Sequence, residues 1–162
     1  MKSLVLVRHG KSSWKYNVLD RERPLKLRGK NDAKLVASKY LETNKRPEYI
    51  YSSPANRALS TCKIFVNTFK LNKNNIKINE NLYDFSGYMV MDFIKSLPNN
   101  QDEVILFGHN YAFTSISNLL GSTYIDNLPT SGLVKINFET NDWKTLNTGK
   151  TVLTLIPKNL KP

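Results

Sequence analysis

The stretch Ser3-Leu-Val-Leu-Val-Arg-His-Gly10 joins a continuous apolar run to the polar pair Arg8 and His9. A short run of aliphatic and β-branched residues is typical of a strand that is buried on both faces, as in a parallel sheet. Sheets of this kind bind their ligands at the carboxyl ends of the strands. The stretch therefore predicts a buried strand that leaves the sheet at Arg8, with His9 where a ligand would lie.

A second stretch later in the chain repeats this pattern. Glu103 to Phe107 is predicted to be a buried strand, and Gly108-His109-Asn110 follows it directly. The chain contains two histidines, and each comes just after the carboxyl end of a predicted buried strand. We expect His9 and His109 to meet at one edge of the sheet.

Helices and further strands alternate between these two stretches and after them. Apolar residues recur at helical spacing in four places, which predicts helices around 33–41, 55–69, 90–97 and 116–120, the last closed by Gly121. Ser53 and Pro54 are expected to be the N-cap and the first-turn proline of the second helix. Short apolar runs predict strands at Tyr49–Tyr51, Ile76–Ile78, Leu133–Phe138 and Thr151–Ile156. This order favours an α/β domain with a mainly parallel sheet covered on both faces.

Length and composition indicate a single soluble domain over residues 1–162. No internal repeat or Pro-rich linker divides the 162 residues, and one cysteine excludes an intramolecular disulfide. The apolar run of four residues before Arg8 is too short for a secretory signal, and no run approaches the roughly 18 apolar residues of a membrane span. We therefore expect a cytoplasmic protein that does not act at a membrane. The absence of a heptad pattern favours a monomer.

The charge of the chain favours an anionic partner. The formal net charge is +11, and residues 1–30 hold nine Lys or Arg against two acidic residues. Such a field attracts nucleic acid, a membrane surface or a phosphorylated molecule. Aromatic residues are not interleaved with Lys and Arg as they are in base-stacking surfaces, which argues against nucleic acid as the main ligand.

Two arginines accompany the histidines. Arg8 precedes His9, and Arg57 lies in the predicted first turn of the second helix, where free backbone N–H groups also favour an anion. Guanidinium groups match the oxygens of a phosphoryl group, and nearby positive charge keeps an imidazole neutral and nucleophilic. We expect His9 to attack phosphorus while Arg8, Arg57 and His109 hold its oxygens, and water then to release inorganic phosphate. No cofactor is expected, and no His, Asp, Glu and Cys cluster has the spacing of a metal site.

The motifs that carry this chemistry also carry a family resemblance. They are Leu-Val-Arg-His-Gly at 6–10, Ser-Ser-Pro-Ala-Asn-Arg-Ala at 52–58 and Gly-His-Asn at 108–110, supported by Lys-Ser-Ser-Trp at 11–14 and Asp-Arg-Glu-Arg-Pro-Leu at 20–25. Together they resemble the histidine phosphatase, or phosphoglycerate mutase-like, superfamily and above all its short SixA-type phosphohistidine phosphatase branch. The resemblance implies a three-layer α/β/α fold, His9 as the phosphorylated nucleophile, and Arg8, Arg57 and His109 as the phosphate pocket.

The proton donor and the mouth of the pocket are less defined. Mutases and broad-specificity phosphatases of this superfamily carry an acidic residue in the segment before the third helix, and the resemblance implies the same position here. Asp84 matches it best and Glu80 second, although Asp84 could equally be a loop carboxylate or a helix cap. Arg21, Arg23 and Ser12 are candidates for substrate binding, with surface solvation as the alternative for the arginines and a turn-ending role for Ser12.

Several functions are compatible with this reading. The leading one is a phosphatase acting on phosphohistidine in proteins, since a protonated imidazole leaves without a strong acid whereas an ester alkoxide needs a proton. A phosphatase for small phosphorylated compounds is the alternative within the same superfamily. A module that binds phosphorylated ligands without turnover and a phosphorelay protein that carries phosphate on His9 are the alternatives outside it.

Overall fold

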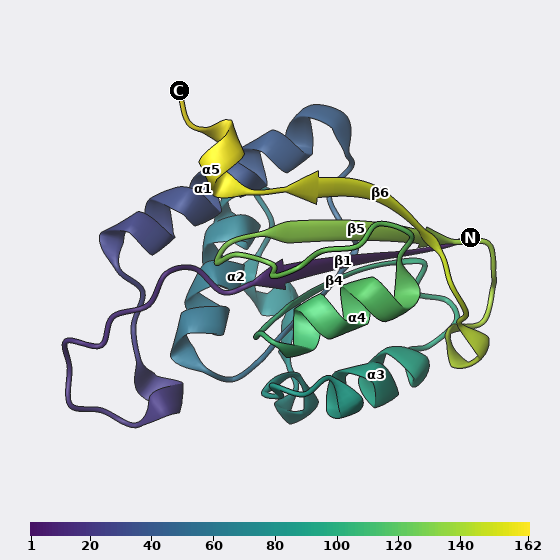
Figure 1. Cartoon of the computed structure of the whole chain (residues 1–162), viewed down its shortest axis with the longest axis horizontal. Coiled ribbons are helices and arrows are strands. Elements are labelled where there is room, and N and C mark those ends of the chain that lie inside the picture. Colours follow the sequence, from purple (N-terminus) through teal and green to yellow (C-terminus); the bar gives the residue numbers. More distant parts are fainter.

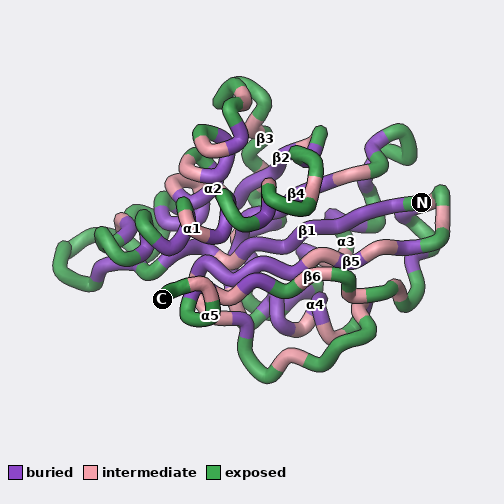
Figure 2. The backbone as a smooth tube through the Cα atoms, turned by 90° about the horizontal axis from the view of Figure 1, so that it is seen from above, coloured by how far each residue is buried: buried purple, intermediate pink, exposed green.

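A computed structural model describes residues 1–162. Its centre is a six-stranded sheet with the strand order β3-β2-β4-β1-β5-β6 (Figures 1 and 2). The first four strands in this order pair in parallel, whereas β5 runs antiparallel to both of its neighbours. The predicted mainly parallel sheet is confirmed. The strands are β1 (Lys2–Arg8), β2 (Tyr49–Ser52), β3 (Ile76–Ile78), β4 (Glu103–Gly108), β5 (Leu133–Phe138) and β6 (Lys150–Leu155).

Five α-helices lie on the two faces of the sheet. Figure 1 shows α1, α2 and α5 on one side and α3 and α4 on the other. Their bounds are α1 (Leu27–Thr43), α2 (Asn56–Thr68), α3 (Tyr88–Lys95), α4 (Ala112–Leu120) and α5 (Pro157–Leu160). Short 3-10 turns complete the chain, namely η1 (Asp20–Glu22), η2 (Lys73–Asn75), η3 (Glu80–Leu82) and η4 (Trp143–Thr145).

The alternation of side chains along β1 explains why helices cover both faces. Leu4 and Leu6 belong to a core cluster with residues of α3 and α4, whereas Val5 and Val7 belong to a second cluster with residues of α1 and α2. All four side chains are buried. A strand with apolar residues on both faces is stable only when both faces are covered, so the run at the start of the chain requires the third layer.

The predicted strands and helices are found, but helix starts differ: α1 begins at Leu27 and α4 at Ala112, several residues before the predicted 33–41 and 116–120. Ser53 and Pro54 were expected to open the second helix, but α2 begins at Asn56, with Ala55 at the N-cap and no side-chain cap. The Ser53 hydroxyl instead accepts a hydrogen bond from the Ala55 amide at 3.2 Å and contacts His109. Ser53 therefore forms a turn before the helix, because its hydroxyl is held at the site rather than at the helix end.

Parallel pairing aligns the ends of three strands. Arg8 of β1 lies opposite Gly108 of β4, and Ser52 of β2 lies opposite Phe107. The residues that follow, His9, His109 and Ser53, consequently emerge at one rim. The His9 amide donates to the Gly108 carbonyl at 3.0 Å, which ties the two chain exits together.

Candidate active site

A pocket of about 260 Å³ opens at this rim. Its lining gathers residues from the ends of β1 and β4, from the segment between β1 and α1, and from the first turn of α2. Four of its side chains are basic, and its single carboxylate belongs to Asp20. The lining residues are Arg8, His9, Lys11, Ser12, Trp14, Asp20, Arg23, Arg57, Phe85, Asn110 and Thr130.

His9 is held in one tautomer by the backbone. Its Nδ1 lies 2.7 Å from the carbonyl oxygen of Gly10. Because a carbonyl oxygen can only accept a hydrogen bond, Nδ1 carries the proton and Nε2 keeps its lone pair. Burial, and then the positive charges of Arg57 and Arg8, lower the pKa of His9 to about 3. The hydrogen bond to Gly10 raises this pKa but does not offset them. The ring is therefore neutral and can act as a nucleophile at Nε2.

His109 lies beside His9, as predicted. The two ring centroids are 5.3 Å apart, and His109 is fully buried. Its Nε2 lies 2.8 Å from the Ser53 hydroxyl, while its Nδ1 has no partner in the protein. Burial and the nearby His9 and Arg57 lower the pKa of His109 to about 2. When Ser53 donates to Nε2, Nδ1 carries the proton. His109 lies behind the lining of the pocket rather than in it.

Arg8 and Arg57 both line the pocket. Arg8 Nη1 donates to the Leu128 carbonyl at 2.9 Å, and the 2 % exposed Arg57 donates twice to Asp20. The Nε atoms of both arginines are buried without a partner. Four basic side chains against one carboxylate in the lining leave an excess of positive charge, which favours an anionic ligand.

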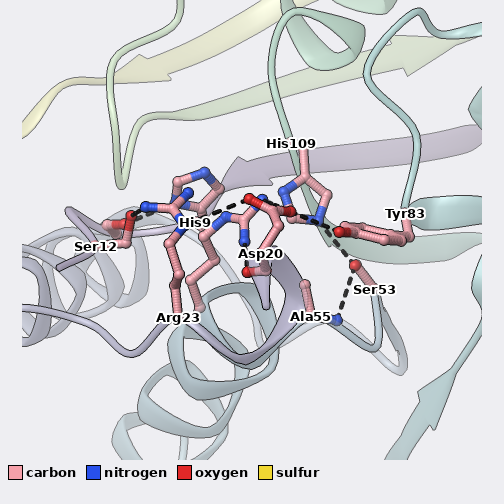
Figure 3. Close-up of polar contacts among 10 residues, drawn as sticks. His9, Ser12, Asp20, Arg23, Ser53, Ala55, Tyr83 and His109 are labelled. Atoms are coloured by element: carbon pink, nitrogen blue, oxygen red, sulfur yellow. Dashed lines mark hydrogen bonds and ion pairs between the residues drawn. The ribbon is translucent and has the colours of Figure 1, made fainter. Parts of the chain in front are cut away.

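Asp20 is a site residue that sequence reasoning missed. Its carboxylate accepts hydrogen bonds from Arg57 Nη2 at 3.0 Å and from the Tyr83 hydroxyl at 2.5 Å, and its carbonyl accepts from Arg57 Nη1 at 2.7 Å. Figure 3 draws the side chain beside the two histidines, joined to Tyr83 by a dashed line. Partial burial raises its pKa, but the hydrogen bonds from Tyr83 and Arg57 dominate and lower it to about 2. The segment at 20–25 held the available signal, because it was one of the motifs that supported the family resemblance.

The candidates for substrate binding separate into two groups. Arg23 and Ser12 line the pocket, where Arg23 Nη1 donates to Ser12 Oγ at 2.8 Å and the guanidinium stacks on Trp14 at 3.6 Å. Arg21 lies outside the lining and forms an exposed ion pair with Glu80. Ion pairs of this kind contribute little to stability.

The two acidic candidates do not reach the pocket lining. The Asp84 carboxylate is buried and accepts hydrogen bonds from the amides of Ser86, Gly87, Met89 and Val90, at the start of α3. Burial raises its pKa, but the hydrogen bonds from Val90 and Ser86 outweigh it and lower the pKa of Asp84. The geometry is that of a helix cap, the alternative left open by the sequence, and Glu80 is paired with Arg21.

Two kinds of structural feature are absent from the protein. No three or more His, Cys, Asp or Glu side chains form a group that could hold a metal ion. No helix has the length and apolarity needed to cross a bilayer.

Solved structures with a similar fold are numerous. The SixA protein of Agrobacterium tumefaciens superposes with a TM-score of 0.80 at 22% identity, over 96% of this chain and 98% of that one. A SixA protein histidine phosphatase in complex with tungstate gives 0.82 at 20% identity, over 98% and 99%. The ecdysone phosphate phosphatase of Bombix mori, also with tungstate, gives 0.65 at 12% identity, over 86% and 90%. These likenesses confirm the expected phosphoglycerate mutase-like fold.

The family itself is shown by sequence. A search of curated protein sequences returns no match. The sequence model of the histidine phosphatase superfamily (branch 1), however, matches residues 4–87, which is just over half of the chain and includes Arg8, His9 and Arg57. The chain therefore belongs to the histidine phosphatase superfamily.

Proposed function

We propose that this protein removes phosphoryl groups from phosphohistidine in proteins, through a phosphohistidine intermediate on its own His9. The observation that carries the proposal is the tautomer of His9. Nδ1 donates to the Gly10 carbonyl at 2.7 Å, which leaves the Nε2 lone pair free in a pocket lined by arginines. Membership of the superfamily makes the chain a phosphatase with a phosphorylated substrate and phosphate as a product. The roles of single residues and the leaving group are our proposal.

The cationic and N–H donors of the pocket hold the phosphoryl oxygens. Arg8 and Arg57 supply guanidinium nitrogens, and His109 supplies Nδ1–H when Ser53 donates to its Nε2. Phosphoryl transfer depends mainly on positioning and on neutralising charge on these oxygens. Tungstate, a tetrahedral oxyanion like phosphate, is bound in two of the structurally similar proteins, which supports an oxyanion site here.

The reaction then takes two displacements at phosphorus. His9 Nε2 forms a bond to phosphorus while the bond to the substrate nitrogen breaks, and the electron pair of that bond stays on the leaving nitrogen. The His9 ring becomes positively charged and keeps its Nδ1 proton on the Gly10 carbonyl. Water next attacks the phosphorus, Nε2 leaves with the electron pair as neutral imidazole, and the water proton passes to solvent or to the released phosphate.

No carboxyl group near the pocket is placed and protonated to act as an acid, and this favours a nitrogen leaving group over an ester oxygen. An alkoxide must receive a proton as it leaves. The only carboxylate in the pocket lining belongs to Asp20, which stays ionised because its pKa is about 2. Asp84 caps α3, and Glu80 is paired with Arg21 outside the pocket. A substrate whose leaving group carries its own proton, such as protonated phosphohistidine, suits this site.

The mouth of the pocket favours a protein substrate. Trp14 and Phe85 line it and are 75% and 47% exposed. Exposed aromatic residues at the rim offer a contact surface to a partner protein. A chain of this length also has little room for the insertions that would build a deep lid over a small substrate.

The test compares two substrates in the presence of a metal chelator. Phosphate release is measured from a phosphohistidine peptide and from p-nitrophenyl phosphate, with the wild type and with His9→Ala. We expect chelator-resistant release that is faster on the peptide, a transient labelled phosphoenzyme, and loss of both in His9→Ala. Lys39→Ala, on the exposed face of α1, serves as the matched surface control.

Other outcomes would redirect the proposal. A preference for the ester would favour a phosphatase for small molecules. A stable phosphoenzyme without release would favour a phosphorelay carrier, and binding of phosphate without release or labelling would favour a non-catalytic module. Full activity of His9→Ala would contradict the mechanism.

A further inference from the structure

We propose that Asp20 makes the site selective for phosphoimidazole, by accepting a hydrogen bond at its Oδ1 from the ring N–H of the leaving imidazole. This inference rests on the proposed function and deepens it. It concerns the ring nitrogen that is not bonded to phosphorus, which the steps above leave without a partner.

The Asp20 carboxylate lies in the lining of the pocket. Asp20 is the only acidic residue in a pocket otherwise lined by four basic side chains and by neutral ones. Its side chain lies beside the two histidines and remains 47% exposed, so that a substrate at the mouth can contact it (Figure 3). The carboxylate holds Arg57 through Oδ2, but its negative charge also opposes the binding of a phosphoryl anion.

One oxygen of the Asp20 carboxylate is free to accept a further hydrogen bond. Oδ2 accepts from Arg57 at 3.0 Å and from Tyr83 at 2.5 Å, so both of its lone pairs are used. Oδ1 has a single long contact, 3.4 Å from Arg23 Nε. A carboxylate has about four lone-pair positions, which leaves Oδ1 open to a donor from the substrate.

The proposed transfer is symmetric, with an imidazole on each side of phosphorus. The first step moves a phosphoryl group from one imidazole to another. On the enzyme side, the ring nitrogen opposite the reacting atom donates to the Gly10 carbonyl at 2.7 Å. The substrate imidazole also needs a hydrogen-bond acceptor for the nitrogen that is not bonded to phosphorus. That nitrogen must carry a proton if the ring is to leave as neutral imidazole when the P–N bond breaks. Asp20 is the ionised acceptor on the open side of the pocket.

The step balances without any transferred proton. The substrate ring enters with its far nitrogen protonated and hydrogen-bonded to Oδ1. The P–N bond breaks, its electron pair stays on the leaving nitrogen, and the ring departs neutral with its N–H intact. The Nε2–P bond forms at the same time, and the positive charge moves to the His9 ring.

The charged and titratable groups that face Asp20 define its pH behaviour. They are Arg23 after η1, Arg57 on α2, Tyr83 after η3 and His109 after β4. These groups keep the carboxylate ionised, so the group that titrates near neutral pH is the substrate ring. A neighbouring carboxylate raises the pKa of a bound imidazole and keeps it protonated to higher pH.

The test uses Asp20→Asn with Glu22→Gln as a matched control. Glu22 lies on the same 3-10 turn and is exposed, and its side chain has no hydrogen bond or ion pair, so its substitution removes the same charge from the same element. Asparagine retains the size of aspartate and one acceptor oxygen toward Arg57. The substrates are the phosphohistidine peptide and p-nitrophenyl phosphate, whose phenolate leaves without a proton.

We expect Asp20→Asn to lower kcat/KM on the peptide by about 10- to 100-fold, the range of a hydrogen bond to a charged group. Its rate on p-nitrophenyl phosphate should fall by a clearly smaller factor, since the leaving phenolate has no N–H that could donate to Oδ1. The alkaline limb of the peptide pH profile should move to lower pH in Asp20→Asn and stay in place in Glu22→Gln.

Three outcomes would overturn the inference. Equal losses on both substrates would show that Asp20 only orients Arg57. Unchanged rates, or an unchanged pH profile, would show that the carboxylate does not contact the leaving ring. Absence of peptide cleavage by the wild type would remove the proposed function and this inference together, whereas normal cleavage with an unaffected Asp20→Asn would remove the inference alone.

Discussion

The two histidines have different hydrogen-bond partners, and this difference assigns them different chemistry. A carbonyl faces Nδ1 of His9, whereas a hydroxyl faces Nε2 of His109. The carbonyl forces a proton onto His9 Nδ1 and leaves Nε2 as a nucleophile. The hydroxyl can donate to His109 and leave Nδ1–H as a donor to the phosphoryl group. The same residue type thus supplies a nucleophile at one position and an electrostatic clamp at the other.

Ser53→Ala tests the assignment of His109. Loss of the hydroxyl frees Nε2 to take the proton, so we expect kcat to fall about tenfold, the effect of one hydrogen bond. Nitrogen NMR shifts of His109 should show the tautomer change. Ser52→Ala is the matched control, because Ser52 is equally buried and bonds only to the Ser53 carbonyl. Equal kcat values for the two variants would contradict the assignment.

Asp84→Ala separates capping from acid catalysis. The carboxylate accepts amide hydrogen bonds at the start of α3, so its removal should lower the free energy of unfolding by about 1–3 kcal/mol. We expect kcat on p-nitrophenyl phosphate to change by less than about threefold at a temperature where the variant is folded. A large loss of kcat with unchanged stability would instead identify Asp84 as the proton donor.

At the scale of elements, the segment between β1 and α1 builds one wall of the pocket. In Figure 1 this segment protrudes from the rest of the protein as a long loop and then leads into α1. Its two arms pair through a bridge between Ser12 and Leu25 and through the Lys26 amide, which donates to the Lys11 carbonyl at 2.8 Å. The position of Ser12 and Lys11 in the wall therefore depends on how closely α1 approaches this segment.

Gly29→Ala tests this dependence. A Cβ atom at position 29 would lie 2.3 Å from the Lys11 carbonyl oxygen and 2.7 Å from the Lys11 nitrogen, so the backbone of the wall must move. We expect a loss of about 1–3 kcal/mol in stability, together with a higher inhibition constant for tungstate. Lys30→Ala, exposed on the same turn of α1, should change neither quantity. A Gly29→Ala protein with unaltered tungstate inhibition would show that α1 does not position the wall.

At the scale of the whole molecule, both core clusters share one sheet, and the site lies at the rim where their strands end. Because β1 contributes side chains to both clusters, loss of the helices from one face would expose apolar residues of a strand that also forms the core of the other face. We propose that residues 1–162 form a single domain that unfolds in one transition. The two buried neutral histidines tie the stability of this unit to pH.

Acid should therefore destabilise the protein well before its carboxylates titrate. The pKa values of His9 and His109 are lowered to about 3 and about 2, so the unfolded chain binds these protons first as the pH falls below about 6.5. Each histidine should remove about 2 kcal/mol from the free energy of unfolding between about pH 7 and pH 5. Urea unfolding at the two pH values measures this loss. In His9→Asn, the loss of unfolding free energy between these two pH values should be roughly halved. A wild type that is equally stable at both pH values would contradict the burial of neutral histidines.

The sequence alone determined the layers of the fold and the rim at which the two histidines meet. Apolar runs such as 3–7 and 103–107 require a sheet covered on both faces, and this arrangement brings the following Arg8, His9 and His109 to one edge. These inferences succeed because they depend on local periodicity and on the direction of parallel strands.

The tertiary structure alone decided the partners of each side chain. The sequence could not distinguish a catalytic Asp84 from a cap, because the difference lies in where the first turn of α3 begins. It could not place Asp20 in the pocket, because Asp20 reaches Arg57 and Tyr83 only after a long segment folds back over the rim. Ser53 likewise meets His109 across 56 residues of chain. Contacts between distant segments follow from packing in three dimensions, which no local pattern encodes.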